Sequence, residues 1–251
     1  MVLLHRGHKM RILVLSDIHA NLAAFEAVLE AVEGQWDRIW CLGDLVGYGP
    51  NPNECIALLR EHDHLSLSGN HDWAVLGKLN ISEFNEDARA VVLWTRSVLE
   101  AESRTYLESL PPKRVVDAFT LAHASPRQPV WEYILDYDTA AANFAHFDTP
   151  YCLVGHSHVP LHIIERHPGD LVVEQVINDE VFSLKNQRVM LNPGSIGQPR
   201  DDDPRAAYAL LDSENLTWQF GRVSYPIEET QEQMRQEDFP RALIERLSYG
   251  W

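Results

Sequence analysis

The sequence predicts a single α/β domain, and three patterns along the chain support that fold class. In the first part, short apolar runs such as 11–15 and 38–42 alternate with segments of helical period such as 22–32. After residue 158 the chain changes to short apolar runs separated by turns, which favours antiparallel strands. Residues 226–248 return to a helical pattern. We therefore expect one domain over residues 10–251, with a parallel-rich part followed by an antiparallel-rich part.

Turn residues and helix caps bound the expected elements. Asn21 can cap the helix after the first strand, and Gly34 ends it. Met10 directly precedes the first strand, so residues 1–9 are expected to be either a disordered N-terminal extension or the result of a misassigned start. The expected strands are 11–15, 38–42, 64–67, 115–116, 119–122, 151–154, 161–164, 171–176, 181–184, 189–191, 206–211 and 216–223, and the expected helices are 22–32, 52–61, most of 71–110, 138–147 and much of 226–248.

Charge and composition exclude several classes of protein. The net charge is −16 and there is no run of Lys or Arg, which disfavours long nucleic acid as a partner. No stretch approaches the roughly 20 apolar residues that span a bilayer, and the N-terminus does not resemble a signal peptide. The three cysteines are dispersed, which favours core positions in a reducing compartment over disulfides. We expect a cytoplasmic protein without a membrane partner.

Side chains that can bind metal directly follow five apolar segments. Because ligands in α/β sheets bind beyond the carboxyl ends of the strands, these side chains should meet at one rim. Residues i and i+2 of an extended chain point to the same side, so Asp17 and His19 can share one ion, and His156 and His158 can reach the same cluster. Glycines precede several of them, as expected where backbones crowd together. The segments are Asp17-Ile18-His19, Gly43-Asp44, Gly69-Asn70-His71-Asp72, His123 and Gly155-His156-Ser157-His158.

The types of ligand indicate a centre of two divalent cations. Carboxylates, imidazoles and one amide, without thiolates, suit Mn²⁺, Fe²⁺ or Zn²⁺ better than they suit a closed structural zinc site. The candidates are too many for one ion and are enough for two if one carboxylate bridges them. Two such cations can hold a hydroxide and clamp phosphoryl oxygens. The candidate ligands are Asp17, His19, Asp44, Asn70, His123, His156 and His158.

Each segment taken alone also has a purely structural interpretation. D-x-H and Gly-Asp are common in turns, and His123 alone is typical of a histidine near the core. Asn70 and Asp72 can simply begin a helix. The metal site is favoured because all five segments occur together, in order and at strand ends.

As a set, D-I-H…G-D-L-V…G-N-H-D…H…G-H-S-H resembles the motif of the calcineurin-like metallophosphoesterase superfamily, D-x-H…G-D…G-N-H-D/E…H…G-H-x-H. The stretches S-D-I-H-A-N-L at 16–22 and N-P-G-S-I-G-Q-P-R at 192–200 bring it closer to small prokaryotic, phosphodiesterase-like members. The resemblance implies a four-layer α/β/β/α sandwich of two facing mixed β-sheets.

The resemblance also implies a role for each motif residue. His71 would face the substrate, stabilise the phosphoryl charge and protonate the leaving oxygen as general acid, and Asp72 can orient or tune it. Mn²⁺ is the first expectation for both ions, with Fe, Zn, Ni and Mg as alternatives. One ion would bind Asp17, His19, Asp44 and His158, and the other Asp44, Asn70, His123 and His156, so that Asp44 bridges them.

Three further residues are weaker candidates for binding substrate. Tyr48 can stack on a substrate base, although packing alone explains it equally well. Asn192 can line the cleft, and Arg200 can contact a phosphate.

The expected function is hydrolysis of phosphodiester or phosphomonoester bonds, in a small phosphorylated substrate or nucleotide, by attack of a metal-bridging hydroxide. An inactive scaffold with the metallophosphoesterase fold, a dinucleotide polyphosphate hydrolase and a nuclease are the alternatives. The intact ligand set and His71 favour an enzyme over a scaffold, and the net acidity disfavours long nucleic acid. The sequence is compatible with a homo-oligomer and does not name the substrate.

Overall fold

The computed structural model describes residues 10–251, so the expected disorder of residues 1–9 lies outside the described residues. The strands are β1 (Arg11–Leu15), β2 (Arg38–Cys41), β3 (His64–Ser66), β4 (Lys113–Val116), β5 (Phe119–Ala122), β6 (Tyr151–Leu153), β7 (Leu161–His167), β8 (Asp170–Glu174), β9 (Val181–Ser183), β10 (Val189–Asn192), β11 (Ala206–Asp212) and β12 (Thr217–Val223). The helices are α1 (Leu22–Ala31), α2 (Pro52–Arg60), α3 (Asn70–Val75), the 3₁₀ helix Ile81–Glu83, α4 (Glu86–Val98), α5 (Ala101–Glu108), α6 (Tyr137–Phe144), α7 (Ile227–Gln236) and α8 (Arg241–Arg246).

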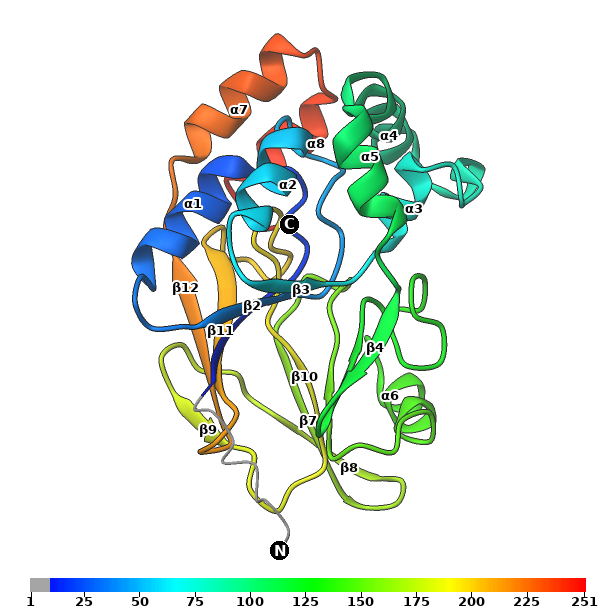
Figure 1. The fold of residues 1–251 in the computed structure, drawn as a ribbon. Helices are drawn as coiled ribbons and strands as arrows, with labels where there is room; N and C mark the ends of the chain where they lie inside the picture. Colours follow the sequence, from blue (N-terminus) through cyan, green and yellow to red (C-terminus); the bar gives the residue numbers. More distant parts are fainter. Residues whose placement is uncertain (1–9) are drawn as a thin grey trace, which may run out of the picture.

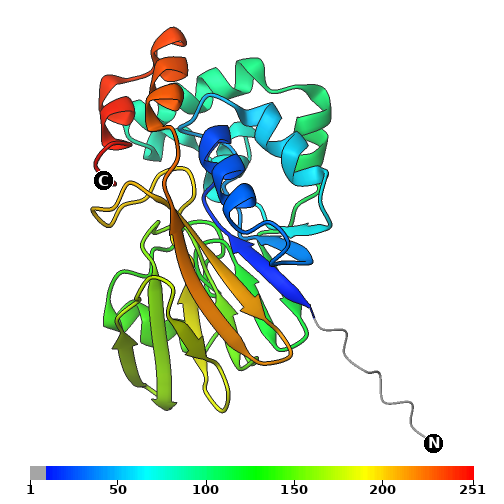
Figure 2. The same cartoon turned by 90° about the vertical axis from the view of Figure 1, so that its left-hand side faces the viewer.

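Within residues 10–251, two six-stranded mixed sheets form the centre of the molecule (Figure 1). One has the strand order β3-β2-β1-β11-β12-β9 and the other β4-β5-β6-β10-β7-β8. In both views all the helices except α6 gather above the strands, whereas α6 lies beside β7 and β8 (Figures 1 and 2). The expected four-layer α/β/β/α sandwich is confirmed.

Three apolar clusters hold the layers together. The cluster between the sheets joins β1 and β2, through Val14 and Trp40, to β6 and β10, through Leu153 and Leu191. A second cluster packs α1, α2 and α4 on the outer face of the first sheet. The third packs α6 on the outer face of the second sheet. Burial of these three sets of side chains is the main apolar contribution to stability.

Both sheets combine parallel and antiparallel pairs. The strands β1, β2 and β3 are parallel, and the expected hairpin of β4 and β5 forms. Most of the later strands pair antiparallel, as predicted, but β10 runs parallel to β6 while it pairs antiparallel with β7. This pairing joins segments far apart in the chain, which the spacing of turns does not reveal. The candidate ligands follow the carboxyl ends of five of these strands, namely β1, β2, β3, β5 and β6.

Local expectations for the first helix and the cysteines are also confirmed. Asn21 caps α1 by accepting a hydrogen bond from the backbone N–H of Ala24 at 3.2 Å. Gly34, with φ of +71°, follows the end of that helix. Cys41, Cys55 and Cys152 are buried free thiols. No helix within residues 10–251 is long and apolar enough to cross a membrane.

Candidate metal centre

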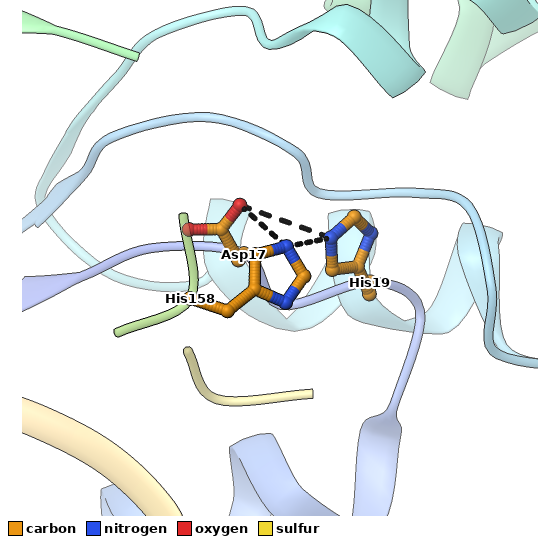
Figure 3. A group of neighbouring side chains, drawn as sticks. All are labelled: Asp17, His19 and His158. Atoms are coloured by element: carbon orange, nitrogen blue, oxygen red, sulfur yellow. Dashed lines mark hydrogen bonds and ion pairs between the residues drawn. The ribbon is translucent and has the colours of Figure 1, made fainter. Parts of the chain in front are cut away.

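Buried side chains from the strand-end loops form two neighbouring groups. In each group the potential ligand atoms lie within 4.8 Å of one another. The first group, drawn in Figure 3, is supplied by the loops after β1 and β6, and the second by the loops after β2, β5 and β6. The groups are Asp17, His19 and His158, and Asp44, His123 and His156.

In the first group two imidazole nitrogens face each other beside a carboxylate. The Nε2 atoms of His19 and His158 are 3.0 Å apart, and Asp17 Oδ1 lies 3.2 Å from His158 Nε2 (Figure 3). The Nδ1 atom of His19 donates to the carbonyl of Val46 at 3.1 Å, and that of His158 to the carbonyl of Gln198 at 2.6 Å. When both rings are neutral, each Nε2 therefore presents a lone pair to the other. A bound cation turns this repulsion into coordination.

The second group centres on Asp44. Its Oδ2 lies 3.4 Å from His123 Nε2 and 3.7 Å from His19 Nε2, so this one oxygen lies between the two groups. Its Oδ1 is already used, because it accepts the backbone N–H of His71 at 2.9 Å. Asn70 Oδ1 is 3.2 Å from His123 Nε2, whose Nδ1 donates to the carbonyl of Leu42 at 3.0 Å. The structure thus brings all seven predicted ligands to one place.

Within residues 10–251, three buried atoms of these groups have no hydrogen-bond partner. They are Asp17 Oδ1, Asp44 Oδ2 and His156 Nε2. A buried polar atom without a partner is costly, and a native structure usually has a reason for it. Oxygen and imidazole donors pointing into one small space suit two divalent cations, so the residues present fit the centre that the sequence predicts.

Burial and mutual charge keep most of these groups in their metal-binding forms. Burial lowers the pKa of His156 to about 3 and also lowers that of His158. Burial acts to raise the pKa of Asp17 and Asp44, but the neighbouring His158 and His123 outweigh it and the pKa of each carboxyl is lowered. His123 is the exception: burial acts to lower its pKa, yet the Asp44 carboxylate raises it to about 9.

The ligand loops adopt strained backbone conformations. We expected Asp17 and His19, and likewise His156 and His158, to converge because an extended chain points alternate residues to one side. That geometry was wrong, because these residues have left-handed φ angles. Such angles cost about 1–3 kcal/mol each for residues other than glycine and are concentrated at functional sites. The angles are 54° at Asp17, 49° at His19, 52° at Asp44, 63° at His156 and 61° at His158.

The expected crowding at the glycines is confirmed. A Cβ atom on Gly69 would lie 2.0 Å from Asp44 Oδ1, and one on Gly43 would lie 2.8 Å from His123 Nδ1. Gly43 also has a φ of +110°, which side chains disfavour. These two positions therefore let the neighbouring loops approach the ligands.

His71 lies at the edge of the two groups. Its ring is buried, its Nδ1 has no hydrogen-bond partner, and its centroid is 4.9 Å from that of His19. Burial lowers the pKa of His71 to about 4, against the opposing charge of Asp44. The ring is therefore neutral at pH 7 in the protein without substrate.

Asp72 was expected to orient or tune His71, but its carboxylate is used elsewhere. It accepts the backbone N–H groups of Asp44, Val46 and Gly69 at 3.0, 3.2 and 2.8 Å. Burial and the charge of Asp44 raise the pKa of Asp72 to about 7. These contacts join the loop after β2 to the loop after β3.

Two of the three weaker substrate-binding candidates, Tyr48 and Arg200, lie beside the metal-ligand groups. Tyr48 lies at the centre, with its ring centroid 4.4 Å from that of His71. The Arg200 guanidinium is 5.6 Å from the centroid of Tyr48, and its Nε is buried without a hydrogen-bond partner. Tyr48 therefore lies beside His71 and His19, and Arg200 lies beside Tyr48.

Asn192 was expected to line the cleft. Instead its side chain is buried, and its hydrogen bonds are made to neighbouring loops. Its amide nitrogen donates to the carbonyl of Gly155 at 2.9 Å and to Ser157 Oγ at 3.0 Å. Its amide oxygen accepts the backbone N–H of Gly194 at 2.8 Å. The side chain is committed to holding the loop that carries His156 and His158.

One residue at the centre was missed in the sequence. The Tyr133 ring stacks on the ring of His156, with centroids 3.8 Å apart and planes at 24°, and its side chain is 44% exposed. Burial raises the pKa of Tyr133, and the nearby Arg200 guanidinium opposes that effect. The stretch W-E-Y-I-L-D-Y at 131–137, with large apolar residues at every second position, was the signal that could have identified it.

Comparison with known proteins agrees with this geometry. The family model of the calcineurin-like phosphoesterase superfamily domain matches residues 10–216. The chain belongs to that superfamily. An uncharacterised protein of Methanocaldococcus jannaschii is 37% identical over 96% of this chain and 99% of its own length. The crystal structure of a metallophosphoesterase from Sphaerobacter thermophilus is 47% identical and has a TM-score of 0.89 over 97% of this chain and 100% of that one.

A more distant member of the fold extends the comparison. A hypothetical protein from Pyrococcus horikoshii is 23% identical and has a TM-score of 0.78 over 96% of this chain and 98% of its own. At that identity the likeness concerns the fold alone. The shared phosphoesterase fold is therefore maintained across considerable divergence in sequence.

Proposed function

We propose that this chain hydrolyses phosphoester bonds at a centre of two divalent cations that share Asp44. The single observation that carries the proposal is the position of Asp44 Oδ2. This buried oxygen has no hydrogen-bond partner and lies 3.4 Å from His123 Nε2 and 3.7 Å from His19 Nε2, between the two groups of ligands. Asp17, His19 and His158 would hold one cation, and Asn70, His123 and His156 would hold the other.

Cations bound there would supply Lewis acidity, both to the phosphoryl oxygens and to a water molecule whose pKa they lower. Imidazole, carboxylate and amide donors without thiolate suit Mn²⁺, Fe²⁺ and Zn²⁺, and Mn²⁺ is our first choice among these ions. The protein itself supplies the rigid arrangement: Asp72 joins two ligand loops through backbone hydrogen bonds, and Asn192 holds a third. Both are positioning residues in this proposal.

His71 would act on the leaving group. The centroid of its ring is 4.9 Å from that of His19, so the ring would lie next to a substrate bound at the two groups. An acid must carry a proton, whereas burial lowers the pKa of His71 to about 4. The negative charge of a bound phosphoryl group opposes that effect and favours the imidazolium form. His71 can then donate the proton to the departing oxygen.

Arg200, whose guanidinium lies 5.6 Å from the centroid of Tyr48, would bind the phosphoryl group. Its buried Nε has no partner, and a guanidinium suits two-point contact with phosphate oxygens. This local positive charge offsets part of the field of a chain whose net charge is −16. The expected substrate is a small phosphomonoester or phosphodiester.

Metal analysis combined with an activity assay tests the proposal. The purified protein, reconstituted with Mn²⁺, should bind two ions per chain and hydrolyse aryl phosphate monoesters or diesters, and EDTA should abolish both properties. The Asp63→Asn variant is a matched control, because Asp63 pairs with Arg38 at the surface. Fewer than one ion per chain together with no turnover of any aryl phosphate would favour an inactive scaffold instead.

A further inference from the structure

We propose that Phe84 and Trp131 form an aromatic subsite for the leaving-group side of the substrate, and that the group it takes is the base of a nucleoside phosphate. This inference rests on the proposed function, because His71 defines the leaving-group side. Phe84 and Trp131 are not among the site residues predicted from the sequence. They would determine specificity and take no part in the bond-breaking step.

A chain of ring contacts leads outward from the metal centre. The centroid of Phe84 is 5.2 Å from that of His71, with planes at 83°. The centroid of Trp131 is 5.5 Å from that of Phe84, with planes at 54°. Trp131 is 37% exposed, so part of its ring is open to a ligand. A leaving group that receives a proton from His71 would therefore have Phe84 next to it and Trp131 one ring further out.

The side chain of the neighbouring residue Glu132 anchors the segment that carries Trp131. Glu132, the next residue, accepts hydrogen bonds from Ser125 Oγ at 2.7 Å and from Asn143 Nδ2 at 2.8 Å, and it also pairs with Arg127. The Glu132 side chain is 13% exposed. The side chains on either side of it, Trp131 and Tyr133, are instead exposed. This alternation fixes both aromatic rings at the rim.

The position of Trp131 favours a nucleoside over a simple aryl group. An aryl ring bonded directly to the leaving oxygen would lie beside His71 and could reach only Phe84. Trp131 lies one ring further out, so a spacer such as ribose is needed to bring an aromatic ring to it. Bases stack on aromatic side chains without needing a particular sequence of hydrogen-bond donors, and an indole ring is a suitable platform.

An adjacent cavity provides an alternative location for the ring. It has a volume of about 190 Å³ and is lined mainly by apolar side chains, among them Ile134 and Leu135, and by Ser157, which stands between His156 and His158 in the sequence. None of the ring contacts from His71 leads into it. Leu135 is 68% exposed and belongs to the same segment as Trp131, so its truncation is a matched control.

Calorimetric binding of two ligands to the Mn²⁺-loaded protein tests the subsite. AMP carries an adenine base where ribose 5-phosphate carries a hydroxyl group. A phosphate assay after each titration checks that both ligands remain intact; if they do not, KM values replace Kd values.

We expect wild-type protein to prefer AMP by about 5- to 150-fold, the range that base stacking on one aromatic ring provides. Trp131→Ala should remove most of that preference and leave the Kd of ribose 5-phosphate within about twofold. Trp131→Phe should keep part of it, and Leu135→Ala all of it.

Three results would overturn the inference. They are equal affinity of the wild-type protein for both ligands, an equal loss for both ligands in a folded Trp131→Ala or Trp131→Phe variant, and loss of the preference in Leu135→Ala, which would locate the base in the cavity. If neither ligand binds the metal-loaded protein, the subsite fails, and the turnover of aryl phosphates decides separately whether the proposed function fails with it. If both bind equally, only the subsite fails.

Discussion

The ligand loops and the segment 127–137 border the same centre but are built in opposite ways. In the loops, Asp17, His19 and Asp44 have left-handed backbone angles, and Asp17 Oδ1 and Asp44 Oδ2 are buried without hydrogen-bond partners. In the segment, the partly buried carboxylate of Glu132 accepts hydrogen bonds from Ser125 and Asn143, and Trp131 and Tyr133 are exposed.

This difference separates two functions. The loops concentrate strain and uncompensated polar atoms, which bound cations can offset. The segment carries neither and presents aromatic surface at the rim. We infer that the loops determine the reaction and that the segment determines which substrate is accepted. Variants in the loops should therefore affect every substrate, whereas variants in the segment should affect only some.

Asp44→Asn should have the largest effect. It removes the one carboxylate that lies between the two groups of ligands. Metal-ion catalysis contributes several kcal/mol, so we expect kcat/KM to fall by about 10³-fold or more for all substrates, with loss of at least one ion. Metal analysis and steady-state kinetics measure both. Retention of both ions and of activity would contradict the claim that the ligand loops determine the reaction.

His71→Ala should come next. A general acid contributes about 10²- to 10⁴-fold, so kcat should fall within that range for esters with poor leaving groups and less for good ones. The metal content should stay at the wild-type level, because His71 is not among the candidate ligands. Unchanged turnover of a poor leaving group would remove His71 from the mechanism.

Asn192→Ala tests the support of the loops. It deletes the hydrogen bonds to Gly155 and Ser157 that hold the loop bearing His156 and His158. Loss of such a support typically lowers metal affinity or activity about 10- to 100-fold. A metal titration should show that weakening. Asn192→Asp keeps the side-chain size and the acceptor but loses the donors, so it should resemble Asn192→Ala; if it behaves as wild type, the loop does not depend on these donors.

Glu132→Gln should have the smallest effect and should concern stability. Burial acts to raise the pKa of Glu132, but hydrogen bonds from Arg127, Asn143 and Ser125 outweigh it and lower the pKa to about 2 from its ordinary value of 4.5. The ionised carboxylate thus stabilises the fold above pH 4.5, and this contribution disappears as the pH falls from 4.5 towards 2. We expect a loss of about 1–2 kcal/mol at pH 7.

Urea unfolding at several pH values measures the Glu132→Gln effect. The difference between wild type and variant should shrink as the pH is lowered through that range, and the metal content of the variant at pH 7 should be unchanged. A difference that is independent of pH would contradict the role of the ionised carboxylate. A loss of metal would show that the segment and the loops are not separate.

The strand-end motifs could be predicted from the sequence because they depend on local patterns. Apolar runs ending at Asp17, Asp44 and His123 identify both a strand and the position of its ligand. The roles of Asp72 and Asn192 could not be predicted, because their partners are backbone groups of other loops. The parallel pairing of β10 with β6 could not be predicted from the sequence for the same reason, because it depends on contacts between distant segments.

The left-handed angles and Tyr133 show a second limit. Nothing in D-I-H reveals that Asp17 and His19 leave the extended conformation, because the surrounding fold imposes those angles on residues that do not prefer them. Tyr133 lies in an irregular segment, and only the folded chain brings its ring to His156. Sequence therefore predicts the candidate metal ligands better than the residues that surround them.

Anomalous diffraction from crystals grown with Mn²⁺ is the most direct test of the central claim, that two cations share Asp44. The account predicts two anomalous peaks per chain, both coordinated by Asp44, with Asp17, His19 and His158 completing one site and Asn70, His123 and His156 the other. A single peak, or two peaks with Asp44 bound to only one of them, would contradict it.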